Sequence, residues 1–324
     1  MPVQPAPMDV HTNSALTTVS TAYIQRPNWL ADRIFPVVPV LKQSDFYYTY
    51  NKDDWFRSVA GVRAPATESP GGGWQVSKDT YYASVYAVHK DLDDQTRANQ
   101  DAQFNLDRDA VEWVTMNLMI KRDAIFVSKY LVAGVWGRDR TGVAGVPAGL
   151  QFKQWDQAGS TPIDDILAER LIIKQTTGFV PNTLVLGAQV MQTLLRHPTV
   201  IELIKYTQTG IPTEDLLAGL FRVDRVVDAD TVENIAPEGG AFSASFQVGK
   251  VALLCYSAPS PGLLRPSAGY IFGWTGLLGS GAVGSTISKF RMPAIKSDRV
   301  EGEMAWDMKL VGADLGTFWS AAVA

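Results

Sequence analysis

The residues that could do chemistry lie far apart in this chain and lack the partners that metal binding or catalysis needs. His11, His89 and His197 have neither the i, i+4 spacing nor the cysteine partners of a zinc site. The acidic run at residues 91–94, DLDD, lacks the glycine and the terminal glutamate of a calcium loop. We therefore expect packing or surface histidines, a solvated acidic stretch, and no metal or other cofactor.

Two glycine-containing segments resemble phosphate-binding loops without their full context. GSGAVG at residues 279–284 satisfies G-x-G-x-x-G, but the following STISKFRMPAIK has no helical stripe. Gly249 and Lys250 lack the leading glycine and the following Ser or Thr of a phosphate loop. No G-x-S-x-G nucleophile elbow occurs. We expect a flexible loop and a strand turn at these two places, and a protein without a catalytic site.

Composition narrows the class of protein further. The chain has 324 residues and is 46% hydrophobic, which is enough for a sizeable core. A net charge of -4 provides no basic stripe for phosphates, so any contact with nucleic acid should be weak and independent of sequence. The single cysteine, Cys255, excludes internal disulfides, and its place in VALLCY predicts a buried small hydrophobe. We find no signal peptide or membrane span, because the longest apolar run is broken by Pro36 and Pro39.

A polar segment rich in glycine and proline, GVRAPATESPGGGWQ at residues 61–75, separates two runs of strand-forming residues. Alternation over residues 45–50 places three aromatic residues on one face, and a second alternation covers residues 82–88. A strand from Asp45 to Arg57 would span on the order of 40 Å, longer than most strands of compact domains. We predict a β-ribbon that projects from its own domain; the alternative is a ribbon that folds back on it.

The strongest helical pattern in the chain covers residues 109–133. Asp107 or Asp109 can cap its start, and Gly134 suits a left-handed exit. At 1.5 Å per residue this helix would be about 35 to 40 Å long and could serve as a spine. The predicted buried stripe consists of Ala110, Trp113, Val114, Ile120, Ala124, Val127 and Leu131.

The middle of the chain predicts an α/β or α+β subdomain. STPIDDILAERLIIKQTTG reads as a helix that Thr161 can cap, with Pro162 in its first turn and Gly178 at its end. VPNTLVLG predicts a buried strand, and three short helical patterns follow at AQVMQTLLRH, TVIELIKYT and TEDLLAGLF. Strands are expected in FRVDRVV, in FQVGKVALLCYS and throughout the last third, which is rich in glycine, aromatic and β-branched residues.

The predicted elements together give the subunit an unusual shape, with a loose arm, a projecting ribbon and a long helix. Such a shape would leave apolar surface exposed, and we expect a partner to cover it. At this point the sequence resembles the major capsid proteins of tailed bacteriophages, which share the Hong-Kong-97-type fold. The segments that carry the resemblance, in the order of the family, are NWLADRIFPVVPV (28–40), KDDWFR (52–57), RAPATES (63–69), YAVHK (86–90), RAN (97–99), PNTLVLG (181–187) and HPTVIELIKY (197–206).

The resemblance implies an α+β fold with five parts. These are an N-terminal arm at residues 1–40, an extended loop at 41–90, a peripheral domain with the spine helix at 91–179, an axial domain at 180–262, and C-terminal strands of the peripheral domain at 263–324. The glycine-rich segment then corresponds to the tip of the extended loop, at residues 58–73, and the ribbon is long because it reaches over a neighbouring subunit. Strand addition between subunits would give such a contact affinity without any chemistry.

The same resemblance implies which residues contact other subunits. At the tip of the extended loop they are Arg63, Pro65, Glu68, Gly71, Gly72, Gly73 and Trp74. At the arm and the base of the loop they are Trp29, Phe35, Trp55 and Phe56. Near the centre of a capsomer, Lys205, Asp215, Arg222 and Asp224 are candidates for charge pairs between subunits or for solvated surface charges.

The function that the resemblance implies is that of a major capsid protein. It would assemble through hexamers and pentamers into an icosahedral shell around the double-stranded DNA of the phage, and it would be found in the virion after assembly in the host bacterial cytoplasm. Scaffold, portal and decoration proteins are possible partners. The alternatives are a subunit of an encapsulin-like compartment, which has the same fold, and a nucleotide-binding enzyme that uses GSGAVG.

Two family features concern processing. Lys42, Lys52 and Lys78 lie on the limbs of the ribbon, but none stands in a motif for a covalent cross-link, so none is predicted. Few residues precede NWLADRIFPVVPV, so we expect either a separate scaffold protein or an already mature form.

Overall fold

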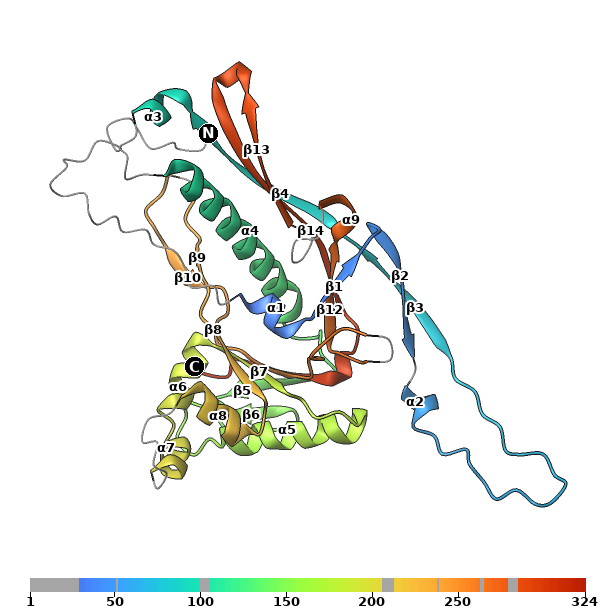
Figure 1. Cartoon of the computed structure of the whole chain (residues 1–324). Coiled ribbons are helices and arrows are strands. Elements are labelled where there is room, and N and C mark those ends of the chain that lie inside the picture. Colours follow the sequence, from blue (N-terminus) through green and yellow to red (C-terminus); the bar gives the residue numbers. More distant parts are fainter. Residues whose placement is uncertain are drawn as a thin grey trace.

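The structure of the chain is a computed structural model, and it describes residues 29–50, 52–99, 105–205, 213–237, 239–262, 265–278 and 285–324. His11, most of the predicted arm and the GSGAVG segment lie outside these residues. Two sheets form the body, and a ribbon extends from it (Figure 1). Within the described part of the chain, no helix is long and apolar enough to cross a membrane.

The first sheet has five strands and is built around the long strand β14. Its order is β1, β12, β14, β13, and β4 pairs with β14 on the other side. The strands are β1 (Val37–Val40), β4 (Ser84–Asp93), β12 (Gly269–Trp274), β13 (Ser285–Met292) and β14 (Ser297–Leu310). The strands predicted for the last third of the chain are therefore present, and most of them form this sheet.

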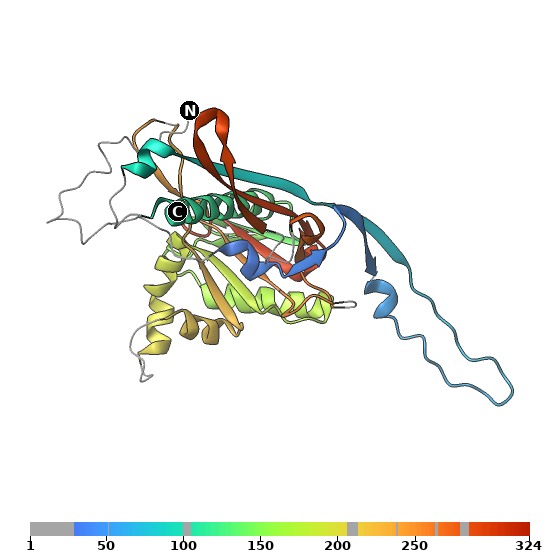
Figure 2. The ribbon, with the colours of Figure 1, turned by 45° about the horizontal axis from the view of Figure 1, so that its top comes forward.

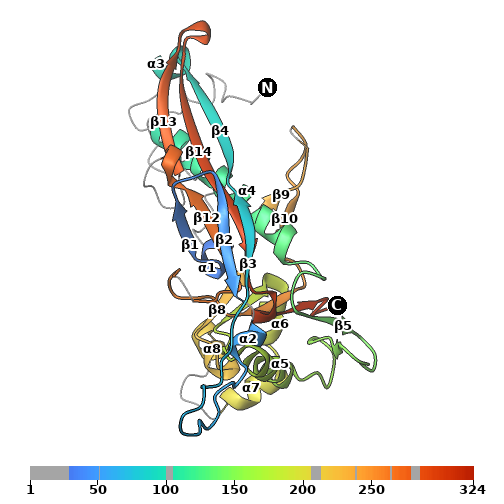
Figure 3. The ribbon, with the colours of Figure 1, turned by 90° about the vertical axis from the view of Figure 1, so that its right-hand side faces the viewer.

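The long helix α4 (Leu106–Tyr130) lies along one face of this sheet (Figure 3). Gly302 in β14 allows the close approach, because a Cβ atom there would lie 2.3 Å from Val114 Cγ1. The helix confirms the predicted spine, but its cap and much of its buried stripe differ from the prediction. Ala110, Val114 and Leu131 are buried as predicted, whereas Ile120, Ala124 and Val127 are only half-buried. The buried apolar residues that the prediction lacks are Leu118, Phe126 and Tyr130. Asn105 caps the first turn by accepting a hydrogen bond from the Arg108 amide, and the Trp113 side chain is 41% exposed.

The second sheet has six strands in the order β6, β5, β15, β11, β7, β8. They are β5 (Arg138–Val143), β6 (Gln151–Lys153), β7 (Thr183–Gly187), β8 (Arg225–Ala229), β11 (Ala252–Cys255) and β15 (Gly316–Ser320). The helices α5 (Pro162–Thr177), α6 (Ala188–Leu195), α7 (Pro198–Ile204) and α8 (Glu214–Phe221) belong to the same part of the molecule. Gly178 ends α5 in the left-handed region, as predicted, with φ of 74°.

The membership of this sheet differs from the predicted domain boundaries. The resemblance places residues 91–179 and 263–324 in the peripheral domain, yet β5, β6 and β15 share one sheet with the strands of residues 180–262. The physical reason is that strand pairing joins segments distant in sequence, which local patterns do not report. Likewise, α1 (Leu30–Ile34) and β1 belong to the body instead of forming part of a loose arm.

Two short two-stranded elements extend from the body. The ribbon consists of β2 (Ser44–Tyr50) and β3 (Val76–Tyr82), and the second hairpin consists of β9 (Val232–Asn234) and β10 (Ala244–Phe246). The ribbon and the loop at its end leave the body on one flank, as Figures 1 and 2 both show. The remaining short helices are α2 (Lys52–Trp55), α3 (Asp94–Ala98) and α9 (Thr275–Leu278).

Candidate assembly surfaces

The two faces of the ribbon have different surroundings. Side chains alternate between the faces of a strand, so Tyr47 and Tyr81 share one face and Phe46 lies on the other. The rings of Tyr47 and Tyr81 stack on Phe272 of β12, with centroid distances of 5.4 and 4.6 Å. The inner face of the ribbon is thereby attached to its own subunit.

The outer face of the ribbon is apolar and exposed. Phe46 and Tyr48 are 59% and 62% exposed, and the Lys78 ammonium lies 5.7 Å from the centre of the Phe46 ring. The exposed apolar residues of this face are Phe46, Tyr48, Tyr50, Val76 and Tyr82. A contiguous exposed apolar face of this kind is typical of a protein interface. Sequence reasoning recognised the aromatic alternation but did not include these residues among the contacts.

Beyond Tyr50 the strand does not continue to Arg57, so the predicted 40 Å strand is wrong. Residues 52–55 form the single turn α2, because Asp53 and Asp54 suit a helix N-terminus better than a strand. Trp55 packs against Tyr50 and Trp74, with ring centres 6.0 Å apart in both pairs. This aromatic cluster holds the two limbs of the ribbon together where the strands end.

The base of the loop is also attached by polar contacts. Asp54 accepts a hydrogen bond of 2.9 Å from the Gln75 amide, which connects the two limbs. Lys52 forms an ion pair with Asp314 in the body of the same subunit. The nearby Phe56 ring remains 61% exposed.

The loop from residue 56 to residue 75 has no regular secondary structure, and its predicted contact residues are all exposed. Arg63 donates from Nε to the Thr67 carbonyl at 2.6 Å, across a tight turn at residues 64–67. The two limbs lie close to each other, because a Cβ atom on Gly72 would lie 3.1 Å from Val59 Cγ2. The exposed contact residues named from the sequence are Arg63, Pro65, Glu68, Gly71, Gly72, Gly73 and Trp74.

Phe35 and Trp29, two of the contact residues predicted for the arm and the loop base, are covered to different degrees by their own subunit. Phe35 is completely buried, with its ring 5.1 Å from Phe126 and 5.0 Å from Tyr130. Phe35 is therefore a core residue and not a contact to a neighbour. Trp29 is half-buried and stands just before α1.

Helix α1 is held on α4 by a buried carboxylate. Asp123 accepts hydrogen bonds from the amides of Leu30 at 2.7 Å and Ala31 at 3.1 Å. Burial raises the pKa of this carboxyl, while the two amides act in the opposite direction. The adjacent Arg122 is also buried and pairs with Asp32. This carboxylate satisfies the amides at the start of α1 that have no partner within the helix.

The four predicted axial residues are exposed and lie around α7 and α8. Lys205 follows α7, Asp215 is in the first turn of α8, and Arg222 ends α8 with φ of 55°. Asp224 follows two residues later. The exposure of these residues is compatible with contacts between subunits, and pairing across an interface stays a prediction.

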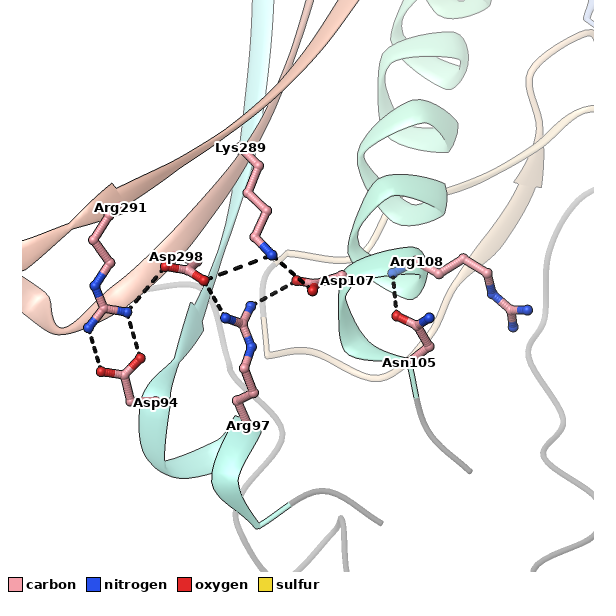
Figure 4. A network of polar contacts seen from close by, with 8 residues as sticks. All are labelled: Asp94, Arg97, Asn105, Asp107, Arg108, Lys289, Arg291 and Asp298. Atoms are coloured by element: carbon pink, nitrogen blue, oxygen red, sulfur yellow. Dashed lines mark hydrogen bonds and ion pairs between the residues drawn. The ribbon is translucent and has the colours of Figure 1, made fainter. Parts of the chain in front are cut away.

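A network of alternating charges joins the β13–β14 hairpin to α3 and α4 (Figure 4). Arg291 binds the carboxylate of Asp94 through two hydrogen bonds of 2.5 and 2.6 Å, and it also contacts Asp298 at 3.2 Å. Asp298 is contacted by Arg97, which reaches Asp107 at 2.8 Å. The Arg291 hydrogen bond lowers the pKa of Asp94. Asp91 likewise pairs with Arg299, and Asp93 caps α3 by accepting a hydrogen bond from the Thr96 amide, so the acidic run at residues 91–94 is not simply the predicted solvated stretch.

His197 and Cys255 both lie in the interior of the subunit. His197 is buried, with Nε2 at 3.0 Å from Ser160 Oγ and Nδ1 at 2.7 Å from Thr199 Oγ1, and burial lowers its pKa. Burial raises the pKa of the Cys255 thiol to about 12, so the reactive thiolate is scarce. Among the described residues, no group of three or more His, Cys, Asp or Glu side chains could hold a metal ion.

Comparison with known proteins gives one related sequence with a stated role. The chain is 31% identical over 222 residues to the major capsid protein of Burkholderia phage BcepMu, covering 67% of this chain and 68% of the relative. No family model matches the chain.

Solved structures resemble the chain over nearly its whole length. A phage-related protein from Bordetella bronchiseptica has a TM-score of 0.68 at 19% identity, covering 92% of this chain and 93% of that one. The capsid of cyanophage P-SCSP1u has a TM-score of 0.61 at 10% identity, with 98% of each chain covered. The SrpI encapsulin from Synechococcus elongatus has a TM-score of 0.58 at 14% identity, covering 99% and 96%.

The structural matches extend over the whole arrangement described above, because each covers at least 92% of this chain. They show the fold, and the BcepMu relative shows the family. The chain therefore belongs to the major capsid proteins of tailed bacteriophages and has the Hong-Kong-97-type capsid fold.

Proposed function

We propose that this major capsid protein assembles through hexamers and pentamers into an icosahedral shell that encloses the double-stranded DNA genome of a phage. The observation that supports this best is the ribbon, whose inner face is stacked on Phe272 while its outer aromatic face is exposed. An exposed apolar face of this kind is a common mark of a surface that binds another protein.

The two sheets suggest a division of roles within the shell. The five-stranded sheet and α4 would form the peripheral domain, and the six-stranded sheet with α5 to α8 would form the axial domain. Lys205, Asp215, Arg222 and Asp224 would then face their counterparts around the centre of a capsomer. At such a centre, opposite charges on adjacent copies fix the register of the ring more than they add affinity.

The proposed location is the virion, after assembly in the host bacterial cytoplasm. A net charge of -4 fits a container that holds packaged DNA without binding it tightly or by sequence. Scaffold, portal and decoration proteins are further partners that assembly of such a shell can require.

Electron microscopy of the purified protein after a sizing column tests the proposal. The full chain should give closed shells or rings of five and six copies. Deletion of Ala60–Gly73 should abolish closed shells and leave the subunit folded, because these residues have no place in either core. Thermal melting of the deletion variant checks that the core is intact. Normal shells from the deletion variant would contradict the role of the loop.

The encapsulin-like compartment is the second candidate, because SrpI has the same fold over 99% of this chain. The contents of the particles distinguish the two functions. Particles made during infection should contain nuclease-protected double-stranded DNA if the chain is a phage capsid subunit. Particles that contain a protein cargo and no protected DNA would favour the compartment.

A further inference from the structure

A groove of about 250 Å³ lies between α6 and the β9–β10 hairpin. Its walls are mainly apolar, with Met191 and Leu195 from α6 and Phe246 from β10. One carboxylate, that of Asp228, also lines it. Exposed polar side chains of α6, Gln189 and Gln192, form the outer margin. A long apolar side chain or an aliphatic stem that ends in a positive charge would match this combination.

The surroundings of the groove are negatively charged. From residue 226 to residue 249 the chain has no Lys or Arg, while Asp228, Asp230 and Glu233 all lie in this stretch. Burial, together with the smaller effects of the charges of Asp230 and Glu214, raises the pKa of Asp228 to about 6. The hairpin next to the groove also exposes Ile235 and Phe242. This surface is therefore both acidic and apolar.

The first limb of the extended loop has the complementary chemistry. Residues 57–63, RSVAGVR, contain two arginines and no acidic residue. Val59 is 47% exposed and the Val62 side chain is fully exposed. The segment has no regular secondary structure, so its backbone can adapt to a groove. The loop thus presents positive charge and short apolar side chains together.

The two surfaces lie on opposite flanks of the molecule. The extended loop projects to one side, while α6 and the β9–β10 hairpin lie on the other (Figures 1 and 2). A contact between them must therefore join two copies. It is also heterologous, because each copy uses a different surface toward each neighbour, and contacts of that kind close into rings when the rotation permits.

We infer that residues 57–63 of one subunit bind in the groove between α6 and β10 of the next subunit. An arginine of the loop, Arg57 or Arg63, pairs with Asp228, and the valines pack against Met191 and Phe246. The inference rests on the proposed function, because it identifies the acceptor surface for the loop within a ring. The observations that favour this part of the neighbour are the apolar walls of the groove, the carboxylate of Asp228 and the lack of Lys and Arg over residues 226–249.

Cross-linking between two variants tests this contact. Val62→Cys and Gln192→Cys are placed in separate copies, one of them enlarged by a tag, and the copies are expressed together. The natural Cys255 is buried and therefore does not react. A short bis-maleimide should link the two variants in assembled particles. The control pairs Val62→Cys with Ile295→Cys, an exposed position at the end of the β13–β14 hairpin, and should give no link.

Charge reversal checks the chemistry of the contact. Arg57→Glu together with Arg63→Glu should reduce the cross-linking yield roughly tenfold, and adding Asp228→Lys in the neighbour should restore most of it. Thermal melting confirms that each variant is folded.

The outcomes separate this inference from the proposed function. If shells form normally but positions 62 and 192 are not linked, the inference that the loop binds in this groove is wrong. The proposed function as a shell subunit is then unaffected. If the unmodified chain forms neither shells nor rings, also when it is expressed together with the neighbouring genes, the proposed function fails and the inference fails with it.

Discussion

The half-buried carboxylate of Asp228 costs the subunit folding free energy at neutral pH. Its pKa is raised to about 6, mainly by burial and to a smaller extent by the charges of Asp230 and Glu214. A folded pKa above the unfolded value means that the ionised group destabilises the folded state, and the loss grows as the pH rises from about 4 through about 6. A residue that lowers stability in this way is often retained for binding.

Replacing this carboxylate by a neutral amide should therefore stabilise the free subunit. We expect Asp228→Asn to raise the free energy of unfolding by about 1 to 2 kcal/mol near pH 7, allowing for partial solvent screening, and to change it little near pH 4. Urea denaturation at the two pH values measures this difference. Asp224→Asn, at an exposed carboxylate, is the control and should change little at either pH. An equal gain from Asp228→Asn at both pH values would contradict the electrostatic explanation.

At the scale of the elements, Phe272 determines how the ribbon is held. Its ring is buried between β12 and the ribbon, where Tyr47 and Tyr81 stack on it. This small aromatic cluster is separate from the two main cores. The direction of the ribbon therefore depends on few contacts, and a single substitution should affect it without affecting the sheets.

Phe272→Ala should lower the free energy of unfolding by about 3 to 5 kcal/mol, as for other buried phenylalanines, and should release the ribbon. Trypsin should then cleave after Lys78 in β3 faster than in the unmodified protein, because β2 and β3 lose their support. Limited proteolysis followed by mass spectrometry measures the rate. Phe290→Ala, at a 41% exposed position on β13, is the matched control. An unchanged rate at Lys78 would show that the stacking does not hold the ribbon.

Local sequence patterns were sufficient for the helices and insufficient for their tertiary partners. The helical periodicity and Gly178 placed α4 and α5 within a few residues, because both signals act within one or two turns. The pairing of β15 with β5 and β11 joins residues more than sixty positions apart, and no local pattern reports it. The charge network of Asp94, Arg291 and Asp298 was missed for the same reason.

Some of the candidate contact residues could be predicted from the local sequence, and others depended on the tertiary structure. Exposure of the loop tip could be predicted from its glycine and proline content, since such a segment cannot bury enough apolar surface to form a core. The burial of Phe35 could not, because an apolar residue beside prolines is equally compatible with an arm that lies on a neighbour. The outer face of the ribbon became a candidate only when Phe272 showed which face is covered.

At the scale of the whole molecule, a subunit that offers a loop on one flank and accepts one on the other behaves differently from a symmetric dimer. Loss of the loop removes one of its two contacts and leaves the other unchanged. A copy that lacks residues 60–73 can still receive a neighbour's loop, and it then ends the chain of contacts at that position.

Such copies should inhibit assembly out of proportion to their number. When the deletion variant is expressed together with the full chain, the yield of closed shells should fall more steeply than the fraction of full-length copies, because one defective contact leaves a ring open. Sizing chromatography over a series of expression ratios measures the yield. Unmodified copies carrying the same tag are the control. A yield that falls only in proportion would argue against contacts that run from one copy to the next.

The position of β15 has a consequence for biosynthesis. Strand β15 lies between β5 and β11, yet every other strand of that sheet precedes it in the chain. During translation the sheet therefore keeps a gap in its interior until residues 316–320 have left the ribosome, and Trp319 cannot yet fill its core. The five-stranded sheet has all its strands once Leu310 has been made, so we expect it to form before the six-stranded sheet is complete.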